Sequence, residues 1–264
     1  MSASAPPRRS APSTRSSARA RRAPGRLRRV SVPVRTEEHG ALRVVALNDP
    51  PTRNALGPLA VERLMEALAV AAADPAVRLV ALTGDGGIFC SGAAIRAWEA
   101  ADGTGETLTD VGTQLCDLIE QLPVPVVGCL PGHAVGGGAE LALACDWRIA
   151  DPAAELRFVH TGFGLIPGFG GLARLELLAG CGAALRLLAT RAAVGAEEAV
   201  RIGLADEIVA GSAQLDWCRA RAEAMAGADR GAVAALKHAL WTGDERSAFL
   251  HVWPERSLPD RLGS

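Results

Sequence analysis

The chain is organised around the stretch His133-Ala134-Val135-Gly136-Gly137-Gly138-Ala139-Glu140-Leu141-Ala142-Leu143-Ala144-Cys145. A short apolar run, residues 126–130, precedes it and ends at Pro131 and Gly132. The three glycines indicate a tight turn, and the alanines and leucines after them indicate a helix beginning near Gly138. The stretch therefore predicts a strand, a glycine turn and a helix in succession.

Two interpretations of this turn are open on the residues alone. Glycines remove the Cβ atoms that keep a ligand away from the backbone, and a helix N-terminus presents unpaired N–H groups. Such groups can hold a carbonyl oxygen that gains negative charge, and Glu140, in the first turn of the helix, is close enough to exchange a proton with the bound group. Alternatively, the glycines only let a strand and a helix pack closely.

Composition and charge limit the class of protein. The 264 residues are 49% hydrophobic, which allows a substantial core, and charged residues, Gly or Pro interrupt every apolar run before the roughly 20 residues that span a bilayer. Residues 1–30 contain nine arginines and no acidic residue, whereas the remainder has 19 Lys and Arg against 29 Asp and Glu. We therefore expect neither a membrane nor a nucleic-acid partner for the acidic body.

Two features bear on where the protein is located in the cell. Residues 1–30, rich in Arg, Ser, Ala and Pro, are interpreted as a disordered extension and excluded from the fold. A transit peptide or a mis-assigned start codon gives the same composition. The six cysteines are scattered without a Cys-x-x-Cys pair, which favours reduced thiols in the cytoplasm over a disulfide framework or a metal site.

Strand and helix patterns alternate along most of the chain. Two β-rich runs, 31–37 and 41–47, flank His39 and Gly40 and predict a hairpin. Helices or buried strands are predicted next at 59–73, 77–83, 111–121, 125–130, 145–150 and 155–158. Beyond residue 171 the pattern is mostly helical, at 172–178, 183–189, 196–201, 213–225 and 231–241. The alternation predicts an α/β architecture whose ligands gather at the glycine turns.

Five groups of residues between Val32 and Trp241 resemble the crotonase (enoyl-CoA hydratase/isomerase) superfamily, in order and at matching spacing. They are Asn48-Asp49-Pro50 with Asn54-Ala55-Leu56, Leu82-Thr83-Gly84 with Phe89-Cys90-Ser91-Gly92-Ala93, Pro125 through Ala142 with Cys145-Asp146, Gly164 with Ile166-Pro167-Gly168 and Gly170-Gly171, and Ala196, Ala199, Gly203-Leu204 and Ile208-Val209. The resemblance implies an α/β fold with a crotonase-like ββα spiral core at 31–190 and a helical C-terminal trimerisation region at 191–264.

The resemblance also implies a mechanism. In this superfamily two backbone N–H groups polarise a thioester carbonyl and stabilise the enolate beside it, and the matching residues are Ala93 and Gly137. Glu140 matches the first of two glutamates that hydratases use. The implied substrate-binding residues are Arg53, Ala55, Gly92, Arg96, His133 and Gly136. Coenzyme A would be part of the substrate, with no other cofactor, and the chain would form a homotrimer or a hexamer.

The second acid position departs from the family pattern. It falls on His160, where a hydratase carries glutamate. An imidazole can give or take a proton near neutral pH, so Glu140 and His160 are a candidate acid/base couple. A core histidine that only satisfies a backbone carbonyl is the alternative for His160. We interpret His133 as a wall of the pocket first and as a proton relay second.

These residues predict an enzyme of the enoyl-CoA hydratase/isomerase type, a lyase or isomerase acting on an acyl thioester in fatty-acid metabolism. The thioester carrier is CoA or a carrier-protein pantetheine. His160 adds C–C bond hydrolysis, decarboxylation and thioester hydrolysis as rivals, because an imidazole can activate water or protonate a carbanion. The alternative of another class is a non-catalytic scaffold or RNA-binding homologue, against which the two intact oxyanion turns and the acidic body argue.

Overall fold

Two β-sheets organise residues 32–256, which are the residues that the computed structural model describes. The larger sheet has the strand order β1-β2-β3-β4-β6-β9, and the smaller has the order β5-β7-β8. The strands are β1 (Val34–His39), β2 (Leu42–Leu47), β3 (Leu79–Gly84), β4 (Val126–Leu130), β5 (Ala134–Val135), β6 (Trp147–Ala150), β7 (Glu155–Arg157), β8 (Ala193–Gly195) and β9 (Glu207–Ile208). The described residues all belong to one structural unit, Ser31–Ser264.

Helices connect the strands and make up most of the C-terminal part of the described chain. They are α1 (Pro58–Ala73), α2 (Ile95–Ala100), α3 (Gly105–Gln121), α4 (Gly137–Leu143), α5 (Gly171–Ala179), α6 (Cys181–Thr190), α7 (Ala196–Arg201), α8 (Gly211–Ala224), α9 (Arg230–Thr242) and α10 (Glu245–Val252), with short 3-10 helices η1 (Pro50–Thr52) and η2 (His160–Phe163). Within residues 32–256, none of these helices has the length and apolar character needed to cross a bilayer.

The large sheet is parallel apart from its first strand. β1 and β2 form the antiparallel hairpin predicted around Gly40, which has a positive φ of 62°. The pairs β2–β3, β3–β4, β4–β6 and β6–β9 are all parallel. Parallel neighbours place their carboxyl ends at one edge of the sheet, and ligands of α/β proteins bind beyond that edge. The glycine turns after β3 and β4 therefore lie at the edge where a site is expected.

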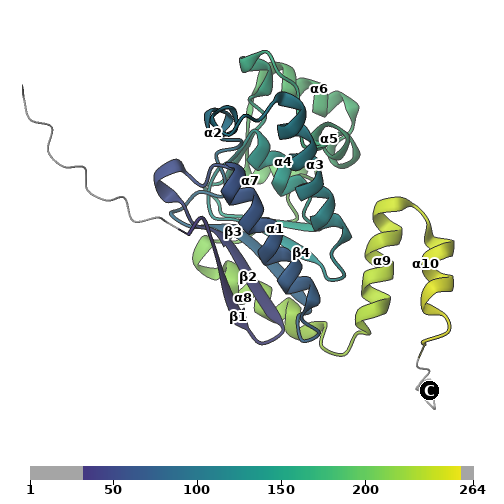
Figure 1. Ribbon diagram of the computed structural model, residues 1–264. Coiled ribbons are helices and arrows are strands. Elements are labelled where there is room, and N and C mark those ends of the chain that lie inside the picture. The colour runs from purple at the N-terminus through teal and green to yellow at the C-terminus, as the bar shows by residue number, and fades with distance from the viewer. Residues whose placement is uncertain (1–31, 257–264) are drawn as a thin grey trace, which may run out of the picture. The chain divides into compact units, whose positions relative to one another are not determined.

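Helices cover both faces of this sheet (Figure 1). Along β3, Val80 and Leu82 pack into one core cluster, which also holds Leu64 and Leu68 of α1. The intervening residue Ala81 packs into a second cluster that includes side chains of α8. The strand is therefore apolar on both faces, as the continuous hydrophobic run at 77–83 predicted.

A buried cation anchors α9, which forms a helical hairpin with α10 (Figure 1). Lys237 on α9 donates from Nζ to the carbonyl oxygens of Ile119 (2.8 Å) and Val124 (3.2 Å) and pairs with Asp146 at 2.7 Å. Burial lowers the pKa of Lys237 below its ordinary value, and the neighbouring Asp146 carboxylate opposes that shift. The ammonium group therefore fixes α9 to the end of α3 and the start of β4.

The structure confirms the predicted fold class and shows where the element boundaries differ. The helix predicted at 111–121 begins at Gly105, because the Thr104 side chain caps it by accepting a hydrogen bond from the Thr107 N–H. The strand predicted at 145–150 begins at Trp147, since Cys145 still bonds back to the end of α4. The predicted extension at residues 1–30 lies outside the described residues.

Candidate active site

Two glycine turns, at residues 90–93 and 135–138, meet beyond the ends of β3 and β4. A parallel bridge joins Cys90 to Ala134. A Cβ atom on Gly92 would lie 2.7 Å from the carbonyl oxygen of Val135 and 3.3 Å from the nitrogen of Gly137. Gly92 also has a φ of 98°, which L side chains rarely adopt. Glycine at position 92 is therefore what lets the two turns come into contact.

The N–H groups of Ala93 and Gly137 are available to a ligand at this junction. Gly137 is the first residue of α4, so its N–H is one that the helix leaves unpaired. Within residues 32–256, neither of the two N–H groups has an acceptor in the protein. Both residues line one cavity. Two such donors, facing a shared space, can stabilise an oxygen that gains negative charge.

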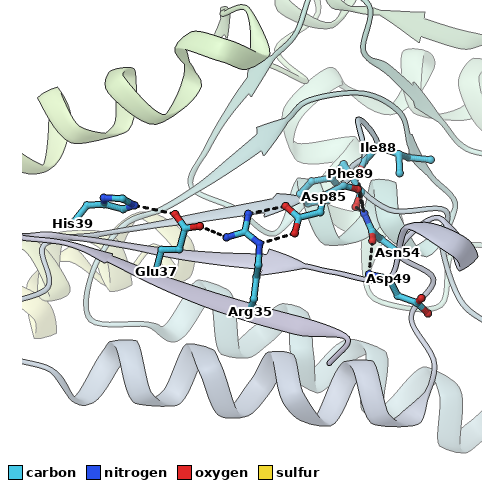
Figure 2. A network of polar contacts seen from close by, with 8 residues as sticks. All are labelled: Arg35, Glu37, His39, Asp49, Asn54, Asp85, Ile88 and Phe89. Carbon is cyan, nitrogen blue, oxygen red and sulfur yellow. Dashed lines mark hydrogen bonds and ion pairs between the residues drawn. The ribbon is translucent and has the colours of Figure 1, made fainter. Parts of the chain in front are cut away.

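Asn54 holds the loop that leads into the first of these turns, as Figure 2 shows for its contacts with Asp85 and Ile88. Its buried side chain accepts from the Asp49 N–H at 2.9 Å and donates to the carbonyl oxygens of Asp85 and Ile88, each at 2.9 Å. Asn54 has a left-handed φ of 58°, a conformation that Asn adopts more readily than most residues. Arg35 holds the same loop through two hydrogen bonds to the Asp85 carboxylate (Figure 2).

The Glu140 carboxylate is held by the main chain of a distant segment. Its side chain is only 2% exposed. Oε2 accepts hydrogen bonds from the N–H groups of Phe169 (2.8 Å) and Gly171 (3.0 Å), and Oε1 accepts from the N–H of Gly168 (3.3 Å). A Cβ atom on Gly171 would lie 2.4 Å from Glu140 Cγ, so the start of α5 can approach only as glycine. Glu140 is therefore oriented before any substrate arrives.

His160 completes a pair with Glu140. Its Nε2 lies 2.9 Å from Glu140 Oε1, and its side chain is 10% exposed. The contact is a hydrogen bond from the imidazole to the carboxylate in the tautomer that carries its proton on Nε2. Nδ1 is buried and has no hydrogen-bond partner among the described residues. The pair that the sequence predicted is thus formed, with Glu140 from α4 and His160 from the start of η2.

Arg174 on α5 fixes the loop that carries these N–H groups. Its Nη1 donates to the Phe169 carbonyl oxygen at 2.6 Å, Nη2 donates to Asp117 at 2.8 Å, and Nε pairs with Glu120. Burial by itself would lower the pKa of Arg174, but these two carboxylates raise it above the ordinary value. The guanidinium group stays charged and ties the loop to α3.

A cavity of about 590 Å³ contains the pair and both turns. Its wall includes most of the residues predicted to act on a substrate, namely Arg53, Gly92, Ala93, Gly136, Gly137, Glu140 and His160. The rest of the wall is largely apolar and includes Ile95, Trp98, Leu108, Phe163, Leu165, Ile166 and Phe169. The cavity therefore joins a cluster of polar groups to apolar space of the kind that an acyl chain fills.

Three residues predicted to bind substrate lie outside this wall. Arg96 is an exposed residue of α2, and Ala55 lies behind the turn, where its N–H contacts Thr52. His133, predicted as a wall of the pocket, is not among the residues that line this cavity. Its Nδ1 lies 3.8 Å from Glu155 Oε2, and its carbonyl oxygen accepts the Phe89 and Cys90 N–H groups. His133 therefore supports the turn at residues 90–93 through its backbone carbonyl group.

Several residues that shape the site were missed from the sequence. Gly171 belongs to the family motif and Phe169 lies between the two parts of that motif, but neither residue is among the predicted site residues, although their N–H groups hold Glu140. Trp98, whose Nε1 donates to the Leu56 carbonyl oxygen at 2.8 Å, was not singled out at all. A tryptophan in the segment that follows the turn at 90–93 is the signal that the sequence offers.

Cys90 is the first residue of the turn at 90–93, and its side chain is buried. Complete burial raises the pKa of its thiol to about 12, and the Gly92 N–H that contacts Sγ opposes the shift only partly. Reactive cysteines need thiolate character and access to solvent. Within residues 32–256, no group of His, Cys, Asp and Glu is arranged to hold a metal ion.

Comparison with known proteins identifies the family. The model of the enoyl-CoA hydratase/isomerase family matches residues 37–250, and the chain belongs to that family. Solved structures agree with the fold, since an enoyl-CoA hydratase from Bacillus anthracis superimposes with a TM-score of 0.76 and 29% identity over 88% of this chain and 100% of that chain. The crotonase resemblance inferred from the sequence is therefore confirmed.

Relatives within the family have different reactions in their names. The chain is 37% identical over 175 residues to a crotonyl-CoA hydratase of Syntrophomonas wolfei, which covers 66% of this chain and 67% of that protein. It is 32% identical over 184 residues to an ethylmalonyl-CoA decarboxylase of Gallus gallus, which covers 67% of this chain and 60% of that protein. The match thus spans about two thirds or less of the length of these two relatives.

Proposed function

We propose that this protein is an acyl-CoA thioester enzyme of the hydratase/isomerase type that works through an enolate. The observation that carries the proposal is the pair of free N–H groups, Ala93 and Gly137, that face one cavity. The thioester oxygen would accept both hydrogen bonds, and they would strengthen as negative charge develops. Removal of one such donor typically costs about 100- to 1000-fold in rate.

The Glu140–His160 pair is the proposed proton carrier. Both side chains line the cavity that holds the two N–H groups. A carboxylate and an imidazole in contact can remove a proton from the carbon next to the thioester and return one to it or to a neighbouring carbon. Arg53 lines the same cavity and is a candidate for binding the CoA phosphates. Coenzyme A would arrive with the substrate, and no other cofactor is proposed.

Exchange of α-protons tests this proposal without knowledge of the natural acyl chain. Butyryl-CoA is incubated with the protein in D2O, and deuterium uptake at the α-carbon is measured by mass spectrometry. An enzyme that forms the enolate catalyses this exchange even where no further step is possible. Absence of exchange by the unaltered protein would refute the enolate proposal.

Two variants assign the proton carrier. Glu140→Gln replaces one oxygen by an NH2 group among four hydrogen-bond donors, and His160→Gln removes the imidazole. We expect each to slow exchange by about 100-fold or more. Glu176→Gln, the same change at an exposed position of α5, is the matched control and should exchange at the parent rate. Parent-rate exchange in folded Glu140→Gln and His160→Gln would reject the pair as the carrier.

A second candidate reaction is decarboxylation of a 2-carboxyacyl thioester. The observation that favours it is the imidazole in place of a second carboxylate, together with similarity to a protein named ethylmalonyl-CoA decarboxylase. The C–C bond to the carboxylate would break, its electron pair would form the enolate, and the protonated pair would deliver a proton to the α-carbon. Release of CO2 from ethylmalonyl-CoA, set against hydration of crotonyl-CoA and isomerisation of a 3-enoyl-CoA, distinguishes the reactions.

Self-association into a trimer or hexamer is the proposed assembly. Large apolar side chains are exposed on α5 and α9, including Leu177, Leu236 and Leu240, and they surround a pocket of about 300 Å³. Such a surface is typical of an interface between subunits. Light scattering during size-exclusion chromatography measures the mass of the assembly in solution, and the mass of a monomer would contradict the proposal. A cytoplasmic location stays a prediction.

A further inference from the structure

The side chain of Phe169 fills a slot between α3 and α4 beside the reacting centre. A Cβ atom on Gly112 of α3 would lie 2.0 Å from Phe169 Cδ1, and a Cβ atom on Gly137 of α4 would lie 2.7 Å from Cε2. The ring therefore packs against two bare backbones and is only 4% exposed. Any side chain at either glycine position would displace it.

The backbone of Phe169 is held as firmly as its ring. Its N–H donates to Glu140 Oε2 at 2.8 Å, and its carbonyl oxygen accepts from Arg174 Nη1 at 2.6 Å. Gly170, the next residue, is left-handed with a φ of 76° and lies against the same guanidinium group. These two bonds fix the backbone from which the ring projects, and the contacts with Gly112 and Gly137 hold the ring itself in place.

The position of this ring restricts what can be attached to the α-carbon of a substrate. With the thioester oxygen on the Gly137 N–H, the α-carbon is two bonds away from that oxygen and must also be reached by Glu140 or His160. The Phe169 ring packs against the backbone of Gly137, the Phe169 N–H bonds to Glu140, and Phe169 lines the cavity that both residues share, so the ring borders the space around this carbon. A second carbon substituent there would meet an aromatic ring that packing holds in place.

We propose that Phe169 is a specificity-determining residue that restricts the site to acyl thioesters unbranched at the α-carbon. The inference rests on the proposed enolate chemistry and adds to it a class of substrate. One methyl group that a tight pocket cannot accept is worth about 10- to 200-fold in discrimination. The proposal also ranks the two candidate reactions, because a 2-alkylmalonyl thioester carries an extra substituent at this carbon.

Butyryl-CoA and isobutyryl-CoA are suitable probes because they are isomers that differ only in branching at the α-carbon. The rate of α-proton exchange in D2O is measured for each, and the ratio of the two rates is compared between proteins. Phe169→Ala and Phe169→Leu replace the aromatic ring by a smaller side chain and leave the backbone hydrogen bonds of residue 169 in place. Phe158→Leu is the matched control, since Phe158 is buried but does not line the cavity.

We expect the parent and Phe158→Leu to exchange butyryl-CoA faster than isobutyryl-CoA by the same ratio. Phe169→Ala should lower this ratio at least tenfold, and Phe169→Leu should give a value between the two. Circular dichroism and urea unfolding report whether each variant is folded, and Phe169→Leu keeps the test open if Phe169→Ala does not fold. An unchanged ratio in a folded Phe169 variant overturns the proposal. Failure of the parent to exchange butyryl-CoA refutes the enolate chemistry itself, and this proposal with it.

Discussion

Gly171→Ala is the variant that most directly tests whether the main chain orients Glu140. Position 171 begins α5 and its backbone is not left-handed, so alanine is compatible with the local conformation. The added Cβ, however, would lie 2.4 Å from Glu140 Cγ and 2.6 Å from Oε2. The perturbation is therefore a single methyl group placed against the carboxylate, with no change in any charged residue.

The size of the effect follows from these contacts. Ordinary carbon–carbon contact is about 3.5 Å or more, so Glu140 or the start of α5 must move by about 1 Å. A misplacement of about 1 Å can cost about 100-fold in rate. Hydrogen bonds to a charged group are worth about 1.5–3 kcal/mol each, and two of them, from Phe169 and Gly171, are strained by the shift. Alanine offsets about 1 kcal/mol of this loss in folding stability, because its helix propensity is higher than that of glycine.

We therefore expect Gly171→Ala to exchange the α-protons of butyryl-CoA about 100-fold more slowly than the parent and to be about 2 kcal/mol less stable in urea. Gly182→Ala is the matched control. It places the same methyl group in the neighbouring helix α6, where nothing lies within 4 Å of the new Cβ. This control should keep the parent rate and gain up to about 1 kcal/mol in stability.

Parent-like exchange by a folded Gly171→Ala protein would refute the reasoning, because it would show that the position of Glu140 does not limit the reaction. A loss of stability without a loss of rate would have the same meaning. An equal loss of rate in Gly182→Ala would show that the effect comes from helix mutations in general. It would also remove the support for the idea that the main-chain N–H groups orient Glu140.

Substitutions at three further residues test the contacts that hold the site and the helices around it together. Asn54→Ala should cost about 2–4 kcal/mol in urea unfolding, because it leaves buried backbone groups unpaired and puts alanine at a positive φ; Asn54→Gly should recover only the backbone part. Arg174→Lys should slow α-proton exchange, because one ammonium group cannot make all three bonds that fix Phe169 and its loop. Lys237→Met should cost about 3 kcal/mol by stranding Asp146. Since burial lowers the pKa of Lys237, parent stability should gain with rising pH between that lowered pKa and the ordinary 10.5, and the variant should lack this gain.

Local features of the fold were predictable from the sequence because they depend on neighbouring residues. The hairpin at Gly40 and the strand–turn–helix around Gly136 are set by a few consecutive side chains, and both are present. The three glycines have separate reasons that only the structure shows. Gly136 takes a positive φ of 53°, whereas Gly137 makes room for the Phe169 ring and Gly138 for the Cys90 carbonyl oxygen.

Contacts between distant segments could not be derived from residue patterns. The N–H groups that hold Glu140 come from residues about thirty positions later, and a backbone N–H has no side chain to mark it in the sequence. Placement of Glu140 and His160 together was inferred from family spacing, and the 2.9 Å contact agrees with it. The direction of single side chains was the least predictable property, as His133, outside the cavity, illustrates.

The site separates what the main chain does from what the side chains do. The main chain supplies the free N–H groups of Ala93 and Gly137 and the three N–H groups that hold Glu140, and side-chain identity matters there only where a Cβ would collide. Substitutions at His160 and Phe169 can therefore alter proton transfer or the space at the α-carbon while both sets of N–H groups remain. Proteins of one fold can differ in reaction by a few side chains, so substitution at residue 160 is a more direct test of the proposed reaction than overall similarity is.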